Sequence, residues 1–298
     1  MTTDLRQLRY LVAVAEAGSI TRAAAALYMT QPALTTAIRK LEHDVGVELL
    51  ERTSRGVDLT PAGEAFLERA QLALEFIDEA TRSARGIGAN PGGEIVLGFL
   101  PATFSELPRE LVSAFRAQHP RVSIRYRELS YITHTRDLHV GHVDLAFLWP
   151  PYDEPELEFQ PLTQEPRVLG VADSHPLANR DNIALDQILD LPFPGFHPAS
   201  SGGWFAAWFF DDRRGGPART TEDETATPFE MALVVQEGRA IAPAAQSFAN
   251  AFPSPGFHWL TLDDAPPATL ALAWHRDNRK PATRAFVRTA RAVTALRR

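Results

Sequence analysis

The first sixty residues contain three short amphipathic segments separated by helix-ending residues, and this pattern restricts the fold more than any other feature. Apolar side chains recur at helical spacing up to Gly18, a typical helix C-terminus. Ser19 can then cap a second helix. A third helix follows Thr30, with Pro32 in its first turn and Gly46 at its end. Two short helices joined by a tight turn predict a helix-turn-helix.

The third helix begins with polar side chains suited to reading DNA. A glutamine can pair with adenine, a threonine can meet a base edge or a thymine methyl, and arginine or lysine can bind phosphates. Two short strands, 49–53 and 57–59, predict a wing directed at the DNA backbone or minor groove, completing a domain over residues 1–60. The expected contacts to double-stranded DNA are Ser19, Thr21, Arg22, Thr30, Gln31, Pro32, Ala33, Thr35, Thr36, Arg39, Lys40, Arg52, Thr53 and Arg55.

Charge alone does not predict a nucleic-acid partner. The formal net charge is −7, and residues 1–60 hold seven basic and seven acidic side chains. Net charge governs solubility more than partner choice, so the placement of the basic groups on one helix has to carry the argument.

Blocks of sequence resemble a known family in order and spacing, and they occupy residues 5–10, 18–24, 31–34, 41–42, 46–52 and 59–63. The chain resembles the LysR-type transcriptional regulators, which implies a DNA-binding role. A three-helix module that packs without DNA is the alternative. The chain departs from the family at Thr36 and Ala37, where relatives usually have Arg and Gln, so the target sequence stays open and a lower affinity or a weaker salt dependence is expected.

Residues 61–86 predict a long helix. Apolar and small side chains step by four and three, as in the seam of a coiled coil, at Phe66, Ala70, Ala73, Ile77, Ala80 and Ala84. We expect a dimerising linker helix, with packing on its own domain as the alternative. Glycines then predict a break and a hinge over 87–92. A phosphate-binding loop is disfavoured because the GxGxxG and GKS arrangements are absent.

Strand-like and helical segments alternate after the hinge, which predicts an α/β fold with a largely parallel sheet. The family resemblance, looser here, implies a periplasmic-binding-protein-like effector domain over 93–298. Its two α/β subdomains are expected over 93–161 with 267–298, and over 162–266. The whole chain is therefore expected to be α/β, with a winged helix-turn-helix, a linker helix and an effector domain.

Ligands of such folds bind beyond the carboxyl ends of strands, often between subdomains. Hydroxyls and exposed helix amides suit a carboxylate, and aromatic rings suit an apolar group. The sequence therefore favours a small organic effector, an apolar or aromatic organic acid, and no cofactor. The expected effector-binding residues are Leu100, Pro101, Ala102, Thr103, Ser130, Tyr131, Trp149, His197, Ala199, Ser200, Ser201, Thr227 and Phe229.

Two stretches leave part of this pocket open. Residues 239–243 depart from the family pattern through Arg239 and a shifted Pro243, which puts one strand's register in doubt. The aromatic segment 202–210 fits a core or oligomer contact as well as a pocket wall.

Other functions are weaker. His134, His139 and His142 lie near Asp137 and Asp144 in sequence, but no acidic partner stands at matching ligand spacing, so we expect no metal. There is no cysteine and no G-x-S-x-G motif, and we expect no enzyme. A pure solute-binding module would leave the first sixty residues unexplained.

We therefore expect a regulator that binds an interrupted inverted repeat as a dimer or tetramer and responds to an effector between its subdomains. Its partners would be DNA, the effector, itself and, as a further candidate, RNA polymerase. No apolar run reaches about 18 residues, so we expect a cytoplasmic protein that does not contact membranes.

Overall fold

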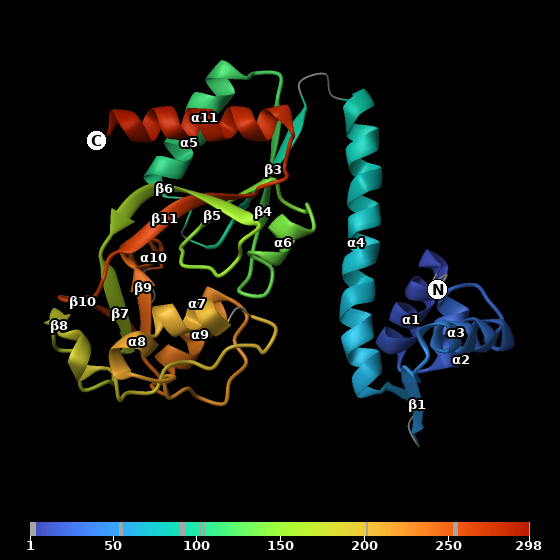
Figure 1. The fold of residues 1–298 in the computed structure, drawn as a ribbon. Helices are drawn as coiled ribbons and strands as arrows, with labels where there is room; N and C mark the ends of the chain where they lie inside the picture. The colour runs from blue at the N-terminus through green and yellow to red at the C-terminus, as the bar shows by residue number, and fades with distance from the viewer. Residues whose placement is uncertain are drawn as a thin grey trace. The chain divides into compact units, whose positions relative to one another are not determined.

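The computed structural model describes residues 4–53, 56–89, 93–101, 103, 105–200, 202–252 and 256–297. It divides into two compact units, Met1–Arg85 and Gly86–Arg298, each with its own hydrophobic core. Figure 1 shows helices with one small two-stranded ribbon in the first unit and mixed sheets with helices in the second unit. Within the described residues, no helix is long and apolar enough to cross a membrane.

The first unit contains three short helices, a two-stranded wing and a long helix. The bounds are α1 (Leu5–Ala17), α2 (Ile20–Ala26), α3 (Gln31–Val45), β1 (Leu50–Thr53), β2 (Gly56–Leu59) and α4 (Pro61–Ala89). Leu11, Leu34 and Leu41 are fully buried in its core. The three helices confirm the predicted helix-turn-helix, and β1 and β2 pair antiparallel as the predicted wing.

Local capping explains where these helices begin and end. Asp4 accepts a hydrogen bond from the Arg6 amide and forms a capping box with Gln7 at the start of α1. Gly18 and Gly46 end α1 and α3 with positive φ angles of 58° and 86°, a conformation that glycine adopts without steric cost.

The two halves of the predicted seam on the long helix α4 have different surroundings in the structure. Phe66, Ala70 and Ala73 pack against the core of the first unit, as the alternative interpretation allowed, whereas Ile77 is 42% exposed. The helix also continues through Gly86 and ends at Ala89, three residues later than expected. A helical glycine costs only about 1 kcal/mol relative to alanine, so the expected break at this position is not obligatory.

The second unit is built on two sheets. The first has the order β4 (Ser123–Glu128), β3 (Glu94–Phe99), β5 (Leu145–Leu148), β11 (Ala268–His275) and β6 (Leu157–Glu165). Strands β3, β4 and β5 are parallel, and β11 is antiparallel to both its neighbours. Helices α5 (Glu106–Gln118) and α11 (Pro281–Leu296) pack together through Phe115 and Phe286, whose ring centroids lie 4.9 Å apart, and α6 (Arg136–His139) is short.

The second sheet has the order β8 (Asn182–Ile183), β10 (Phe257–Leu262), β7 (Arg167–Ala172) and β9 (Ala242–Ala245). The helices that accompany it are η1 (Leu185–Gln187), α7 (Gly202–Trp208), α8 (Asp211–Arg214), α9 (Pro228–Gln236) and α10 (Gln246–Ala251). The chain passes between the two sheets twice, at Pro166 and between Leu262 and Ala268. Side chains on either side of these crossings can therefore meet in one site.

Candidate nucleic-acid interface and ligand pocket

Helix α3 has one apolar and one polar face. Leu34, Ile38 and Leu41 are buried with at most 3% exposure and hold the helix on the core. The polar and small side chains of the other face are exposed in the structure, namely Gln31, Pro32, Ala33, Thr36, Arg39 and Lys40. This face projects from the unit as a set of hydrogen-bonding and positively charged groups.

The threonines of α3 are less free than their sequence implied. Thr30 occupies the N-cap position, but its side chain makes no capping hydrogen bond. The hydroxyls of Thr35 and Thr36 donate to the carbonyls of Gln31 and Pro32 at 2.9 Å. Each hydroxyl has only one hydrogen, so toward a base these threonines can accept a hydrogen bond or offer a methyl group, but not donate.

Helix α2 places its predicted contacts on the surface. Ser19 caps the helix by accepting from the Arg22 amide at 3.4 Å, and Thr21 and Arg22 are exposed. The Arg22 guanidinium donates to the carbonyl of Ala17, so its position is fixed at the end of α1. The negative end of the α1 helix dipole also stabilises a cation at this position.

Tyr28 is a surface residue that the sequence analysis missed. It lies in the turn between α2 and α3, with a positive φ of 53° and a side chain that is 99% exposed. Fully exposed tyrosines are poor contributors to a core, and the phenol is a hydrogen-bond donor. The only sequence feature that could have indicated it is a large aromatic residue in the predicted tight turn.

The wing is attached to the first helices through its backbone. The Val57 amide donates to the Gly18 carbonyl, and a Cβ on Gly56 would lie 2.4 Å from that oxygen, so only glycine fits there. Arg52 and Thr53 lie in β1, but their side chains and all of Ser54 and Arg55 fall outside the described residues.

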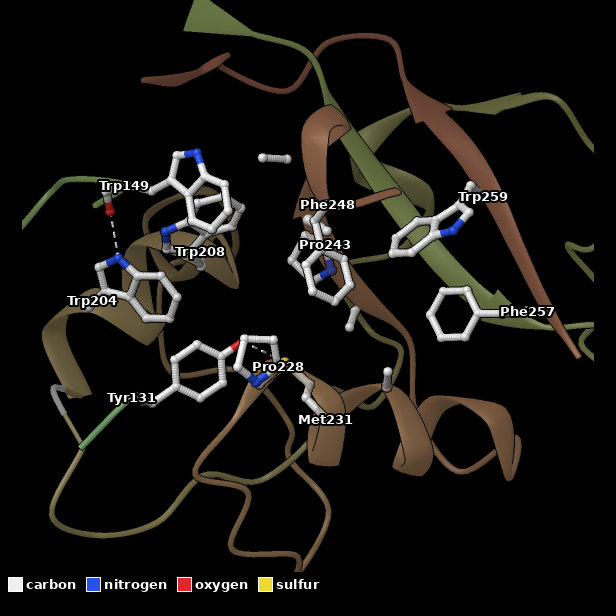
Figure 2. Close-up of a pocket in the computed structure, with 14 residues that line it drawn as sticks. Tyr131, Trp149, Trp204, Trp208, Pro228, Met231, Pro243, Phe248, Phe257 and Trp259 are labelled. Carbon is white, nitrogen blue, oxygen red and sulfur yellow. Dashed lines mark hydrogen bonds between the residues drawn. The ribbon is translucent and has the colours of Figure 1, made fainter. Parts of the chain in front are cut away.

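A pocket of about 50 Å³ lies in the second unit, against the second sheet and at the crossing to the first (Figure 2). Four tryptophans and a tyrosine dominate its wall, which is mostly apolar. The lining residues are Tyr131, Trp149, Trp204, Trp208, Pro228, Met231, Ala232, Ala242, Pro243, Ala244, Ala245, Phe248, Phe257 and Trp259.

Two polar atoms in this wall are buried without a hydrogen-bond partner among the described residues, the Nε1 atoms of Trp208 and Trp259. The other polar groups of the rings are occupied. Trp204 Nε1 donates to the Trp149 carbonyl at 2.7 Å, and the Tyr131 hydroxyl donates to Met231 Sδ at 3.9 Å. Burial raises the pKa of the Tyr131 hydroxyl, which therefore stays protonated.

Gly170 makes room for the aromatic wall. A Cβ at this position in β7 would lie 2.2 Å from the Phe257 ring and 3.0 Å from Trp259. Both rings come from β10, the antiparallel neighbour, in which Trp259 is directly opposite Gly170. A larger residue here would push the rings into the pocket.

Arg167 is a buried cation behind the pocket. It is 6% exposed, its guanidinium carbon lies 4.4 Å from the centroid of the Trp208 ring, and its Nη1 donates to the Ala207 carbonyl. Loss of solvation lowers its pKa to about 10. Among the described residues no carboxylate forms an ion pair with it, and the charge of Asp212 acts on it only from a longer distance.

The departure at residues 239–243 does not disturb the strand. Pro243 lies in the edge strand β9 opposite Leu169, where the missing amide hydrogen is tolerated, and it lines the pocket. Arg239 lies before the strand and forms ion pairs with Asp223 and Glu237. The aromatic segment supplies both core and wall, since Phe205 is 1% exposed while Trp204 and Trp208 line the pocket.

The structure brings together only some of the residues expected to bind the effector. Tyr131 and Trp149 line the pocket, whereas the Phe229 ring, expected there, is 47% exposed and packs against Phe252 instead. Thr227 caps α9, which turns Pro228 toward the pocket and the next residue away. Successive residues of a helix are rotated by about 100°, so Pro228 and Phe229 face different ways.

The remaining expected residues lie outside this lining. Leu100, Pro101 and Thr103 are buried, and the Thr103 hydroxyl donates to the Leu100 carbonyl at 2.7 Å. Ser130 forms hydrogen bonds with its own loop, His197 accepts from the Ala199 amide, and the Ser200 hydroxyl is buried without a partner among the described residues. Ala102 and Ser201 fall outside the described residues.

The three histidines considered for a metal site have different partners. His134 Nδ1 lies 3.0 Å from the Ser130 carbonyl, His142 Nδ1 lies 3.4 Å from Asp137, and His139 Nε2 lies 2.9 Å from Glu154. His139, Glu154 and the exposed Glu156 have potential ligand atoms within 4.8 Å of one another. Of these three residues, only His139 belongs to the group that the sequence analysis considered as metal ligands.

Known protein families match both units of the chain. The family model for the LysR substrate binding domain matches residues 88–295, and that for the bacterial regulatory helix-turn-helix protein, lysR family, matches residues 5–64.

Curated relatives extend this match along the chain. The HTH-type transcriptional regulator BudR of Raoultella terrigena is 32% identical over 95% of this chain and 99% of its own length. The Hca operon transcriptional activator HcaR of Escherichia coli (strain K12) is 32% identical over 95% of this chain and 96% of its own. The match to the regulator AlsR of Bacillus subtilis (strain 168) is 37% identical but spans 63% of each protein.

Among solved structures, CbnR, a LysR family transcriptional regulator, has the same fold, with a TM-score of 0.69 and 23% identity over 98% of this chain and 99% of that one. Its full-length complex with target DNA gives a TM-score of 0.66 at 22% identity, over 97% and 99%. Both family models and the relatives matched from end to end lead to one conclusion. The chain belongs to the LysR family of DNA-binding transcriptional regulators, with an N-terminal helix-turn-helix and a C-terminal effector-binding domain.

Proposed function

We propose that this regulator senses an apolar organic acid, preferably an aromatic one, in the tryptophan-lined pocket. The observation that carries the proposal is the pair of buried, unpartnered indole N–H groups of Trp208 and Trp259 in an otherwise apolar wall. A buried donor without an acceptor costs about 1–3 kcal/mol. A carboxylate oxygen would satisfy such a donor, while the aromatic rings would enclose the ligand's apolar part.

Arg167 favours an acid over a neutral ligand. Its buried guanidinium stacks on Trp208 and forms no ion pair among the described residues, so it places a positive potential behind the wall that the more distant Asp212 offsets only in part. Bringing a carboxylate into an apolar pocket is costly unless a cation compensates it. Arg167 supplies this compensation without blocking the pocket.

Ligand binding has to widen the pocket. An engineered apolar cavity of about 150 Å³ admits benzene, whereas this pocket encloses about 50 Å³. Trp149 follows the first sheet and Trp208 belongs to α7 beside the second, and their ring centroids lie 6.1 Å apart. A ligand between them would change the angle between the sheets, and it acts on the protein only through its different affinity for the two arrangements.

On DNA, we propose a dimer or tetramer that binds an interrupted inverted repeat, with α3 in the major groove and the wing on the flanking backbone. The exposed face of α3 supports base contacts from Gln31 and phosphate contacts from Arg39 and Lys40. Tyr28 is added as a phosphate contact because its side chain is fully exposed beside α3. Regulation rather than catalysis, a cytoplasmic location and RNA polymerase as a further partner belong to the same proposal.

The pocket is tested by titrating the full-length protein with benzoate and following tryptophan fluorescence. All five tryptophans lie in the second unit, so the emission reports on that unit alone. Butyrate, which lacks the aromatic ring, and benzyl alcohol, which lacks the charge, show how much each group contributes to binding. Saturable quenching by benzoate, with weaker responses to both comparison compounds, is expected.

A filling variant, Ala244→Phe, is expected to weaken benzoate binding at least tenfold because Ala244 lines the pocket. Ala251→Phe on the exposed end of α10 is the matched control and should bind as the wild type does. If benzoate, butyrate and benzyl alcohol all fail to alter the emission, or if Ala244→Phe binds benzoate unchanged, the pocket is not the effector site.

A further inference from the structure

A second hollow in the effector unit, unrelated to the aromatic pocket, is lined largely by arginines. This groove has a volume of about 240 Å³ and lies between helix α11 and strands β11 and β6. We name it the arginine groove. Its lining residues are Glu158, Trp274, Arg276, Asn278, Arg279, Thr283, Arg284, Val287, Arg288 and Arg291.

The charge of the arginine groove opposes that of the chain. Five arginines and one glutamate line it, a net of +4, whereas the chain as a whole carries −7. Arg284, Arg288 and Arg291 are exposed and occupy positions i, i+4 and i+7 of α11, so they form one row on one face of the helix. Like charges at this spacing destabilise a helix, so the row is unfavourable in the absence of an anion.

The guanidinium groups of this row are poorly neutralised. Arg291 Nε donates to Gln160 Oε1 at 3.1 Å, and Arg279 forms an exposed ion pair with Asp277. Arg284 and Arg288 make no ion pair within the part of the chain that the structure describes. Their donors are therefore free to bind an oxyanion, which guanidinium groups do in a bidentate manner.

A second, independent observation comes from the wall of the groove. Thr283 is 1% exposed, lines the groove, and its Oγ1 is buried with no hydrogen-bond partner among the described residues. A hydroxyl in this condition is unsatisfied, and an anionic oxygen in the groove would accept its hydrogen. Trp274 and Val287 add an apolar surface to the same wall.

We propose that the arginine groove is a second ligand site, which binds a small, densely charged oxyanion carrying phosphate or several carboxylate groups. A groove lined by several arginines suits a compact ligand that enters it, because their side chains border one hollow. The bound anion would neutralise the arginine row of α11. The groove is a site separate from the aromatic pocket, whose wall shares no residue with it.

Isothermal titration calorimetry of the full-length protein with inorganic pyrophosphate, and separately with citrate, tests the proposal at constant ionic strength. The expected result is saturable binding of at least one of them, and the stronger ligand identifies phosphate or carboxylate as the preferred chemistry. Arg284→Gln with Arg288→Gln should weaken it at least tenfold. Arg213→Gln with Arg219→Gln removes the same charge from exposed arginines elsewhere and should change it less than twofold.

Three results would overturn the proposal. The first is no binding of either anion, as would follow if another copy of the chain covers the groove in solution. The second is an equal loss in both double variants, which would mean that only net charge matters. The third is binding of duplex DNA alone through Arg284 and Arg288, which would make the groove a nucleic-acid contact.

Discussion

The two candidate sites of this regulator are assembled in opposite ways. The side chains expected to contact DNA on α2 and α3 come from residues 19–40, and the helix period alone decides which of them are exposed. The pocket wall comes from residues between Tyr131 and Trp259 and depends on strand pairing and on the crossing between two sheets. A local site can be recognised from a short sequence pattern, whereas a non-local site requires the fold.

The largest expected effect is a loss of DNA affinity when two positive charges on α3 are reversed, with no change at the effector pocket. Arg39→Glu with Lys40→Glu places two acids on the exposed face of α3 and should weaken DNA binding at least about 100-fold, because phosphate contacts and counterion release are lost. Benzoate binding should be unchanged. Fluorescence anisotropy with the intergenic DNA beside the protein's own gene, over a salt titration, measures the effect.

The matched control for this prediction is Arg213→Glu with Arg219→Glu, which makes the same change in net charge on the effector unit. Its DNA affinity should stay within about threefold of the wild type, since neither arginine belongs to the helix-turn-helix unit. Equal losses in the two double variants would show that α3 is not the DNA-reading element.

The second prediction concerns the pH dependence of stability, which is expected to differ between the two units. His134 in the effector unit is 1% exposed, and burial lowers its pKa to about 4, so it is neutral in the folded state. The unfolded chain gains a proton below about pH 6.5, so stability is lost as the pH falls from 6.5 toward 4. The loss at pH 5 is about 2 kcal/mol. His43, in the helix-turn-helix, is exposed.

Urea unfolding followed by tryptophan fluorescence at pH 7 and pH 5 measures this loss for the effector unit alone. His134→Gln should reduce the difference between the two pH values, whatever its effect on stability at pH 7. The same substitution at the exposed His43 should leave the difference unchanged. A pH difference that His134→Gln does not alter would show that other groups are responsible.

The third prediction tests base reading by α3. Gln31 is exposed at the start of the helix, and Gln31→Ala should weaken binding to the specific DNA by about 1.5 kcal/mol, or roughly tenfold, with little change on unrelated DNA. Arg39→Ala should instead weaken both, and lower the salt slope by about one. Parallel anisotropy titrations on the two DNAs distinguish them, and an equal loss for Gln31→Ala on both would exclude base reading.

Sequence reasoning succeeded where structure is local. The bounds of α1, α2 and α3 follow from Gly18, Gly46 and the apolar spacing, and the strands and helices of the effector unit follow from alternation along the chain. The sequence analysis missed Tyr28 because this residue is exposed by a backbone turn with positive φ, a conformation that tyrosine rarely adopts.

The sequence indicated a pocket with aromatic residues, but of the residues that line the observed pocket it named only Tyr131 and Trp149. Trp259 and Phe257 line it only because β10 pairs with β7 in a register that puts Gly170 beneath them, and no short-range pattern specifies that register. Phe229 lies outside the lining of this pocket because the direction of a side chain depends on where the helix cap sets the rotation of α9. Non-local strand pairing and helix rotation thus decide which residues line the observed pocket, and neither can be inferred from a short stretch of sequence.

The smallest expected effect examines the indole donors of the pocket. Trp208→Phe removes Nε1 while keeping an aromatic ring over Arg167, and it should weaken benzoate binding by about 1 kcal/mol, or roughly fivefold, because one hydrogen bond to the carboxylate is lost. Benzyl alcohol should respond less, since it carries no charge. Trp274→Phe, outside this pocket, is the matched control. Equal affinities for benzoate in Trp208→Phe and Trp274→Phe would mean that the acid group is held elsewhere, and that the pocket selects ligands by the shape of its apolar wall alone.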